Sequence, residues 1–438
     1  LLQTTEMASV YGTAPPTSQL VVQKDEKDWQ MENISPAMNI LHVPRAQYVR
    51  TTLSARFSPA QHDIASLFVS NLGSGTASNG QSNTARLTAL HAERNFSHDH
   101  EFVHMTMAMP TSASAIGKAS SIMFQNEWSN PTFSEEFVEL QKRHLIAEMH
   151  SLHADQKFQV KSNFIKSLFE KTMYHIPIEH RIRRLQLLTA DDLTKFHQDW
   201  FTGNNTYVTI VAPTAETATA VQQHFPAHTE TPETTLSWLS KPRQPLNQHI
   251  VLPGYGSFQI MIGQTVAVKK GDTDEIALRC AAEILGGGMT GRLMHTVREQ
   301  RGLGTYGLYA VIQTVNTRTD QIFGVQGTFS PSSLKEGMQC TRELVENWHK
   351  HGVSPQELKN AKDKMIGSHL IASDTVDNLH SMVINSILQN KNPKQEFKLF
   401  EKQVQTLTLQ QVNAAIRKYI DPTKMSSVVV GPPVTPTK

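Results

Sequence analysis

The chain has 438 residues, of which 39% are hydrophobic and 18% charged, and its net charge is +2. This length suits two or three domains, each with an apolar core of its own. A balanced charge argues against nucleic-acid and membrane-surface partners, and no segment reaches the ~18 apolar residues of a membrane span.

The two cysteines, Cys280 and Cys340, are too few for a disulfide framework and lie in apolar, helix-like contexts. We therefore expect two buried free thiols. The sequence starts Leu-Leu-Gln without a methionine or a visible signal peptide. A removed leader or an upstream polypeptide would explain this start, and we favour a bacterial periplasmic setting over a mitochondrial one.

In chain order, residues 1–35 are polar and aperiodic, which indicates a tail or linker. A first domain is expected over 36–227, a Thr/Pro-rich linker over 228–247, and a second domain over 248–438. Periodicity predicts helices at 59–72, 134–152, 274–285, 336–350 and 355–372, and strands at 38–43, 48–57, 101–109, 205–213, 257–263, 323–329 and 425–432.

The two predicted domains resemble each other. A Thr-capped helix followed by a β-branched strand begins at Thr189 and again at Thr408, 219 positions later. Long helices begin at Ser134 and Ser354, 220 positions apart, and Gly73 and Gly286 follow two earlier helices at a spacing of 213. Three landmarks in one order indicate a duplicated domain. Because helices and strands are grouped instead of strictly alternating, we expect an α+β fold with mostly antiparallel sheets.

The segment 285–306 is the most distinctive part of the chain. It joins three glycines, a short amphipathic stretch with Arg298, and Tyr306. It resembles the signature of the second domain in the pitrilysin/insulinase family of zinc peptidases. That resemblance implies twin α+β domains related by pseudo-symmetry, and a second domain without metal whose Arg298 and Tyr306 grip the substrate peptide and support its oxyanion.

The two gripping residues have open alternatives. The step from Arg298 to Tyr306 is eight positions, one more than is usual in the family, and Arg301 is an alternative grip. Arg298 would otherwise pair with Glu299 or cap a helix, with Tyr306 in the core. The glycines lack the Gly-Lys-Ser/Thr ending of a phosphate loop, so we expect a turn that lets a substrate backbone pass close by.

The family's zinc motif, His-x-x-Glu-His, lies on the leading helix of the first domain. Counting back from Gly75-Thr76 places Ser66, Val69 and Ser70 at those three positions. Hydroxyls are poor zinc ligands and valine is no base, so the motif is absent. Glu148 follows Ser70 by 78 positions, where the third ligand would lie, and one carboxylate alone does not hold zinc.

Other histidine sets give weaker zinc signals. His175 and His180 have a proline between them, and His144, Glu148 and His150 do not share one helix face. His98, His100 and His104 are separated by even steps, so they are expected on one sheet face, where exposed histidines are commoner than a metal site. No Gly-x-Ser-x-Gly elbow supports a serine hydrolase.

The resemblance therefore implies the metal-free half or subunit of a zinc endopeptidase. It would form a heterodimer or clamshell with a zinc-binding homologous partner and enclose an extended peptide, with no cofactor in this chain and zinc in the partner. The chain alone is expected to be inactive. The alternatives are an inactive peptide-binding or structural assembly protein of the same fold, and a self-sufficient zinc enzyme with an unfamiliar site.

Overall fold

The computed structural model describes residues 29–35, 37–74, 81–169, 176–225, 244–268, 272–304, 307–314, 321–389 and 391–433. The predicted linker at 228–247 falls almost wholly outside these ranges, so the proposed domain boundaries stay predictions. The predicted tail at 1–35 ends in a strand, β1 (Gln30–Ser35), which pairs with β2. The polar stretch Gln-Met-Glu-Asn-Ile-Ser gave no alternation to reveal it.

The first sheet has six strands in the order β1-β2-β6-β3-β5-β4, and all neighbours are antiparallel except β2 and β6. Its strands after β1 are β2 (Met38–His42), β3 (Val49–Arg56), β4 (Glu93–His98), β5 (Phe102–Met109) and β6 (Thr206–Ala212). The helices of this half are α1 (His62–Asn71), α2 (Asn83–Ala89), α3 (Ala113–Ser121), α4 (Glu135–Ala154), α5 (Gln156–Leu168), α6 (Ile178–Leu187), α7 (Ala190–Trp200) and α8 (Ala215–Gln222), with the shorter η1 (Pro59–Gln61), η2 (Ile122–Trp128) and η3 (Gly203–Asn205).

The second sheet repeats this topology with the order β7-β11-β8-β10-β9, and its one parallel pair is β7 and β11. Its strands are β7 (Asn247–Val251), β8 (Phe258–Val266), β9 (Tyr309–Thr314), β10 (Gln321–Phe329) and β11 (Ser426–Gly431). The helices are α9 (Thr273–Gly286), α10 (Leu334–His351), α11 (Pro355–Ala372), α12 (Val376–Leu388), α13 (Pro393–Thr406) and α14 (Leu409–Tyr419), with η4 (Met294–Gln300) and η5 (Pro422–Lys424). The expected α+β fold with two related halves is confirmed.

Local signals explain most helix ends. Thr189 and Asp192 form a capping box at the start of α7, and Thr408 and Gln411 form one at the start of α14. Each satisfies two backbone N–H groups that a helix start leaves open.

Both predicted buried thiols are confirmed, and burial raises the pKa of Cys280 to about 11.

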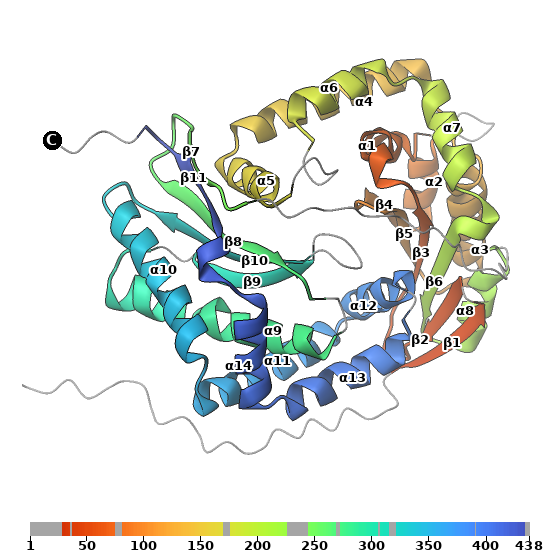
Figure 1. Cartoon of the computed structure of the whole chain (residues 1–438). Helices are drawn as coiled ribbons and strands as arrows, with labels where there is room; N and C mark the ends of the chain where they lie inside the picture. Colours follow the sequence, from red (N-terminus) through yellow and green to blue (C-terminus); the bar gives the residue numbers. More distant parts are fainter. Residues whose placement is uncertain are drawn as a thin grey trace, which may run out of the picture.

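Two equivalent helices are exchanged between the halves (Figure 1). Helix α5 belongs to the first half but packs on the second sheet, where Val160, Phe164 and Leu168 meet Met261 and Val428. Helix α12 begins 220 positions after α5 and packs on the first sheet. There its apolar residues join those of the strands in one cluster, which includes Leu379, Val383, Leu388, Leu41, Phe102 and Val211.

The exchange of α12 is reinforced by polar contacts. Asp377 Oδ1 accepts hydrogen bonds from Tyr48 Oη at 2.6 Å and from Arg50 Nη1 at 2.7 Å. Arg56, only 1% exposed, donates to the carbonyl of Leu388 at 3.2 Å and lies over the ring of Phe102. The two halves therefore share their cores instead of meeting at a simple boundary.

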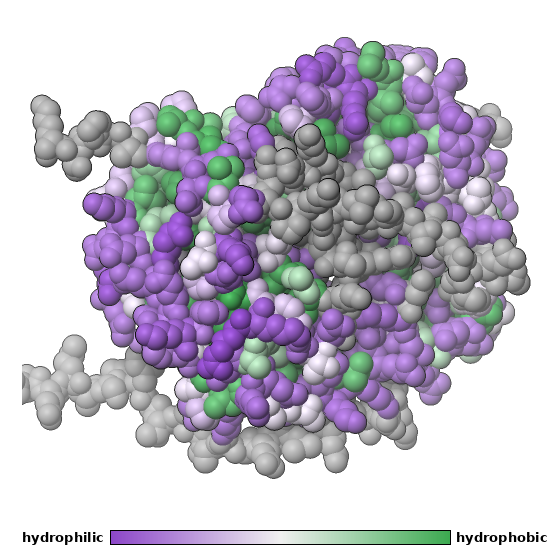
Figure 2. Space-filling model, in the orientation of Figure 1, coloured by the Kyte–Doolittle hydropathy of each residue, from purple (hydrophilic) through white to green (hydrophobic). Residues whose placement is uncertain are grey.

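No described helix is both long and apolar enough to cross a lipid bilayer. The face drawn in Figure 2 is mostly hydrophilic, with hydrophobic residues scattered in small groups.

Candidate functional site

Arg298 lies on η4, a short π-helix that follows the glycine turn. Single π turns are rare and are frequent at functional sites. The Arg298 side chain is half-buried, and its carbonyl accepts a hydrogen bond from Gly302 N at 2.9 Å. Glu299 pairs with His295 at 3.1 Å, and Arg301 is the exposed residue that directly follows η4.

Tyr306 lies outside the described residues, but its flanks are described. Gly304 pairs with Phe329, and Tyr309 pairs with Gln326. The step between these two pairs is five positions on one strand (309 − 304) and three on the other (329 − 326), so the register changes between them.

Arg292 positions the start of η4, and sequence reasoning missed it. Its guanidinium holds the carboxylate of Glu357 with two bonds, Nε–Oε1 at 2.7 Å and Nη2–Oε2 at 2.8 Å, and also donates to Gly352 O at 3.0 Å. This pairing lowers the pKa of Glu357 to about 2. Because Glu357 also closes the capping box of α11 with Ser354, the segment 285–306 is tied to the start of that helix.

The glycine turn is packed against the chain itself. A Cβ at Gly286 would lie 2.4 Å from the backbone N of Ala310 on β9, and one at Gly287 would meet the Glu283 carboxylate. Lys364 contacts both that carboxylate and the Gly287 carbonyl. Glycine is required at position 286 because a side chain would push β9 away. The expected approach of a substrate backbone stays a prediction.

The three positions of the zinc motif lie on α1 and are used inside that helix. Ser66 Oγ donates to His62 O at 2.9 Å, and Ser70 Oγ donates to Leu67 O at 2.8 Å. Val69 packs against the apolar cluster between α1 and its neighbours. Glu148 is exposed on α4. Gly75 and Thr76, from which the positions were counted, are outside the described residues.

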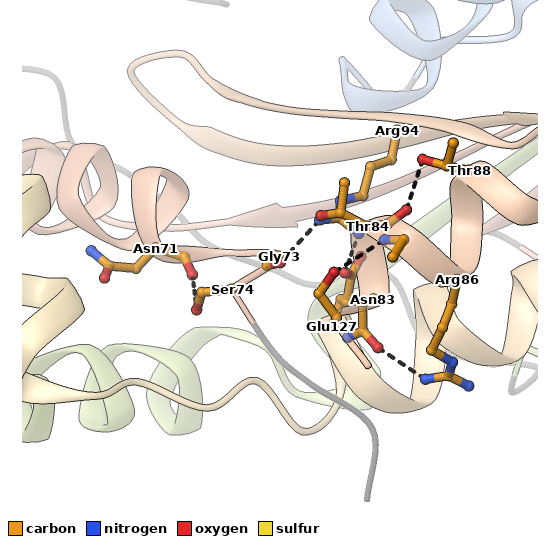
Figure 3. A network of polar contacts seen from close by, with 11 residues as sticks. Asn71, Gly73, Ser74, Asn83, Thr84, Arg86, Thr88, Arg94 and Glu127 are labelled. Atoms are coloured by element: carbon orange, nitrogen blue, oxygen red, sulfur yellow. Dashed lines mark hydrogen bonds and ion pairs between the residues drawn. The ribbon is translucent and has the colours of Figure 1, made fainter. Parts of the chain in front are cut away.

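The end of α1 is closed by a buried polar network (Figure 3). Arg94 of β4 donates to the Gly73 carbonyl at 3.0 Å, to Thr84 Oγ1 at 2.8 Å, and to Glu127. Gly73 has a φ of +82° and no room for a Cβ beside the Arg94 guanidinium. Burial raises the pKa of Glu127 to about 7 although Arg94 lies beside it. Glu127 is 2% exposed, so the network serves to fix β4 against α1 and η2.

The histidines do not share one sheet face as we expected. The chain turns between β4 and β5, so the pairings are Ser97 with His104 and His98 with Val103, which puts His98 and His104 on opposite faces. His104 contacts Ser54 Oγ at 2.8 Å, whereas the rings of His98 and His100 lie 4.8 Å and 5.1 Å from that of His62. Burial lowers the pKa of His62 to about 3.

The other histidine sets give no site either. Helix α6 starts directly after Pro177, and His175 lies outside the described ranges. His144, Glu148 and His150 are all exposed on α4. Within the described part of the chain, no group of three or more His, Cys, Asp or Glu side chains is placed to hold a metal ion.

Residues 187–365, which include the whole segment 285–306, match the family profile described as Peptidase M16 inactive domain. This matched part of the chain, 179 of its 438 residues (365 − 187 + 1), is similar to the M16 peptidase family. M16 is the pitrilysin family, so the resemblance seen in the sequence is confirmed. At the positions counted for that family's zinc motif, the first half of the chain carries Ser66, Val69 and Ser70.

Similar proteins agree with this assignment. An uncharacterised zinc protease of Streptomyces coelicolor is 21% identical over 263 residues, which are 58% of this chain and 56% of that protein. The chain thus spans little more than half the length of this curated relative. A peptidase M16 inactive domain from Pseudomonas fluorescens has a TM-score of 0.78 at 20% identity, covering 94% of this chain and 100% of that one.

A third comparison concerns size. The periplasmic protease PqqL of Escherichia coli has a TM-score of 0.74 at 14% identity, and the match covers 99% of this chain but 49% of PqqL. At these identities the structural matches describe the fold. This chain therefore has the fold of about half of that longer protease.

Proposed function

We propose that this chain is the metal-free half or subunit of a pitrilysin-type zinc endopeptidase. It binds an extended peptide and supplies Arg298 and Tyr306 to the active site of a homologous partner that carries His-x-x-Glu-His. The partner provides the zinc and the general base, and cleavage occurs within the peptide.

One observation carries this proposal. At the positions of the motif, the hydroxyls of Ser66 and Ser70 are hydrogen-bonded within α1, while the segment 285–306 is retained with Arg298 on a π turn. The motif positions thus carry no metal ligands, and the segment 285–306 is the part to which we assign the grip on the substrate. A match to 49% of a longer protease supports a second half of similar size.

The chemistry follows from the donor types. An arginine offers a rigid fork of N–H groups and a tyrosine offers one hydroxyl, and both donate to carbonyl oxygens. Donors aimed at the oxyanion of a peptide under attack stabilise the transition state more than the substrate. Because Val69 stands at the position of the motif's general base, we assign these donors to a reaction whose nucleophile is activated in the partner.

The decisive experiment is reconstitution. The full chain is co-expressed with a homologue from the same source that bears His-x-x-Glu-His, and the purified complex is tested on internally quenched peptides. We expect cleavage by the heterodimer and none by either subunit alone. Full activity of the zinc subunit by itself would refute the proposal. Recovery of this chain alone from its native source, or within a large assembly without a zinc-motif homologue, would favour the structural alternative.

A further inference from the structure

A groove of about 510 Å³ lies on the second sheet beside α5. Its floor includes Met261 of β8 and Gln326 of β10, and Tyr309, Val311 and Gln313 of β9 line it further out. The register pairs Tyr309 with Gln326 and Val311 with Gly324, so these residues share the face on which α5 rests. The groove therefore follows the outer strands of the sheet.

The groove exists because α5 covers only part of that face. Phe164 of α5 packs above Gly263 and Gly324, where a Cβ on Gly263 would lie 3.0 Å from its ring. The helix thus settles close to the sheet over β8 and β11. Beyond it, β9 is the last strand in the sheet order, and among the described residues its only strand partner is β10.

The wall formed by α5 is positively charged. Lys157 and Lys161 are both exposed, and their spacing of four places them on the same side of the helix. Neither has an ion-pair partner among the described residues, and no carboxylate is among the described residues that line the groove. Among the described residues, two ammonium groups thus flank the groove without a carboxylate beside them.

The duplicated half shows that this arrangement is a departure. The position in α12 equivalent to Lys157, 220 residues later, is Asp377, which binds Tyr48 and Arg50 of the first sheet. The position equivalent to Lys161 is Ser381. Helix α12 thus uses an acidic side chain to attach itself to its sheet, whereas α5 has two exposed lysines beside the groove.

An extended peptide suits this geometry. A strand that adds to a sheet edge gains backbone hydrogen bonds, and alternate side chains point to one face. A peptide beside β9 would direct every second side chain toward the groove and its lysines. Carboxylates are the side chains that two ammonium groups select, because opposite charges favour encounter and like charges oppose it.

We propose that the groove between α5 and β9 selects extended peptide segments with acidic side chains, which Lys157 and Lys161 recognise. The inference rests on the proposed peptide-binding function and adds a specificity to it. It concerns binding by this chain alone, so it can be tested without the zinc partner.

The test compares three fluorescein-labelled heptapeptides that differ only at two alternate positions, Thr-Val-Glu-Val-Glu-Val-Thr and its versions with glutamine or lysine in place of glutamate. Fluorescence anisotropy with the full chain at low ionic strength gives each dissociation constant. We expect the glutamate peptide to bind about 10-fold more tightly than the glutamine peptide, with a preference that weakens as salt is added. The lysine peptide is expected to bind most weakly.

Two variants locate the effect. Lys157→Glu with Lys161→Glu should abolish the acidic preference and favour the lysine peptide. Lys335→Glu with Lys359→Glu makes the same change in net charge at exposed positions away from the groove and should leave the preference intact. Thermal unfolding of each variant verifies the fold, and Lys157→Gln with Lys161→Gln is a milder substitute should the reversal destabilise α5.

The outcomes are distinct. Equal binding of the three peptides, or an acidic preference that survives the groove variant, would overturn the inference and leave the proposed function standing. Absence of binding to all three would also overturn the inference, and the reconstituted cleavage assay would then judge the proposed function by itself.

Discussion

Arg292 and Glu357 form a two-pronged ion pair, at 2.7 Å and 2.8 Å, across 65 residues of sequence. The pair joins the segment that precedes η4 to the first turn of α11. The pair should contribute more to the free energy of unfolding than a surface ion pair does, because both side chains are mostly buried, with 26% and 31% exposure. A shielded pair that loses one partner leaves the other charge poorly solvated.

We therefore expect Arg292→Ala to lower the free energy of unfolding by about 2 kcal/mol. Urea denaturation measures this change, and Arg417→Ala, at an exposed arginine of α14, is the control that should stay within about 0.5 kcal/mol of the wild type. A pKa of about 2 for Glu357 means that its contribution is complete above the unfolded value of 4.5 and is lost as the pH falls toward 2. An equal effect of both variants would contradict this role.

Arg298→Ala and Tyr306→Phe address the proposed chemistry. Each should reduce turnover by the reconstituted complex about 10- to 1000-fold, the range for loss of a donor to an oxyanion or carbonyl. Steady-state kinetics with a quenched peptide measures this, and an unchanged melting temperature shows that the chain is intact. Arg301→Ala tests the alternative grip in the same assay. Wild-type turnover in both Arg298→Ala and Tyr306→Phe would contradict the assignment.

Metal removal gives a simple contrast. The hydroxyls of Ser66 and Ser70 donate hydrogen bonds within α1. We therefore expect the isolated chain to contain far less than one zinc per molecule by elemental analysis. Treatment with 1,10-phenanthroline should leave its melting temperature unchanged and abolish cleavage by the complex. Stoichiometric zinc in the isolated chain would favour a self-sufficient enzyme.

Acid should weaken the attachment of α12. His380 is 1% exposed against the first sheet, and burial lowers its pKa to about 3. The unfolded chain takes up its proton near pH 6.5, so this histidine lowers stability progressively as the pH falls from about 6.5 toward 3. The difference between the urea midpoints at pH 7 and pH 5 should be smaller in His380→Leu than in the wild type. His144→Gln, at an exposed histidine, should behave as the wild type does.

The exchanged helices should make the two halves unfold together. Trp128 lies in the core of the first half and Trp348 in that of the second. Variants that retain only one of the five tryptophans, either Trp128 or Trp348, therefore report on one half each. Phe164→Ala should cost about 3–5 kcal/mol and shift both reporters by the same amount. Leu187→Ala, at a side chain 79% exposed, is the control. Two separated transitions would show that the halves are independent.

Local patterns were sufficient for much of the fold. The helix predicted at 355–372 matches α11 residue for residue, because Ser354 caps it and a proline opens it. The duplication was also visible, since caps and strand ends recur at nearly one spacing. The exchange of α5 and α12 could not be predicted, because the apolar pattern of a helix does not indicate which sheet the helix will pack on.

The candidate site was partly predictable for the same reason. The absent metal ligands follow from residue identity at Ser66, Val69 and Ser70. The partner of Arg292 is 65 residues away, and only the acidic residue of a capping box, Glu357, hinted at it. The histidines were misplaced because even spacing implies one face only within a single strand, and here a turn intervenes at Asp99.

The position of α12 also sets an order of events during synthesis on the ribosome. The first sheet is complete at Ala212, but the helix that covers it begins at Val376, 164 residues later (376 − 212). At ~5–20 residues per second, this face of the first sheet stays uncovered for about 8–33 s before α12 is synthesised. The second sheet has no such delay, since α5 is made before it. During this interval the nascent first half exposes an apolar sheet face, and we expect chaperones to bind it then.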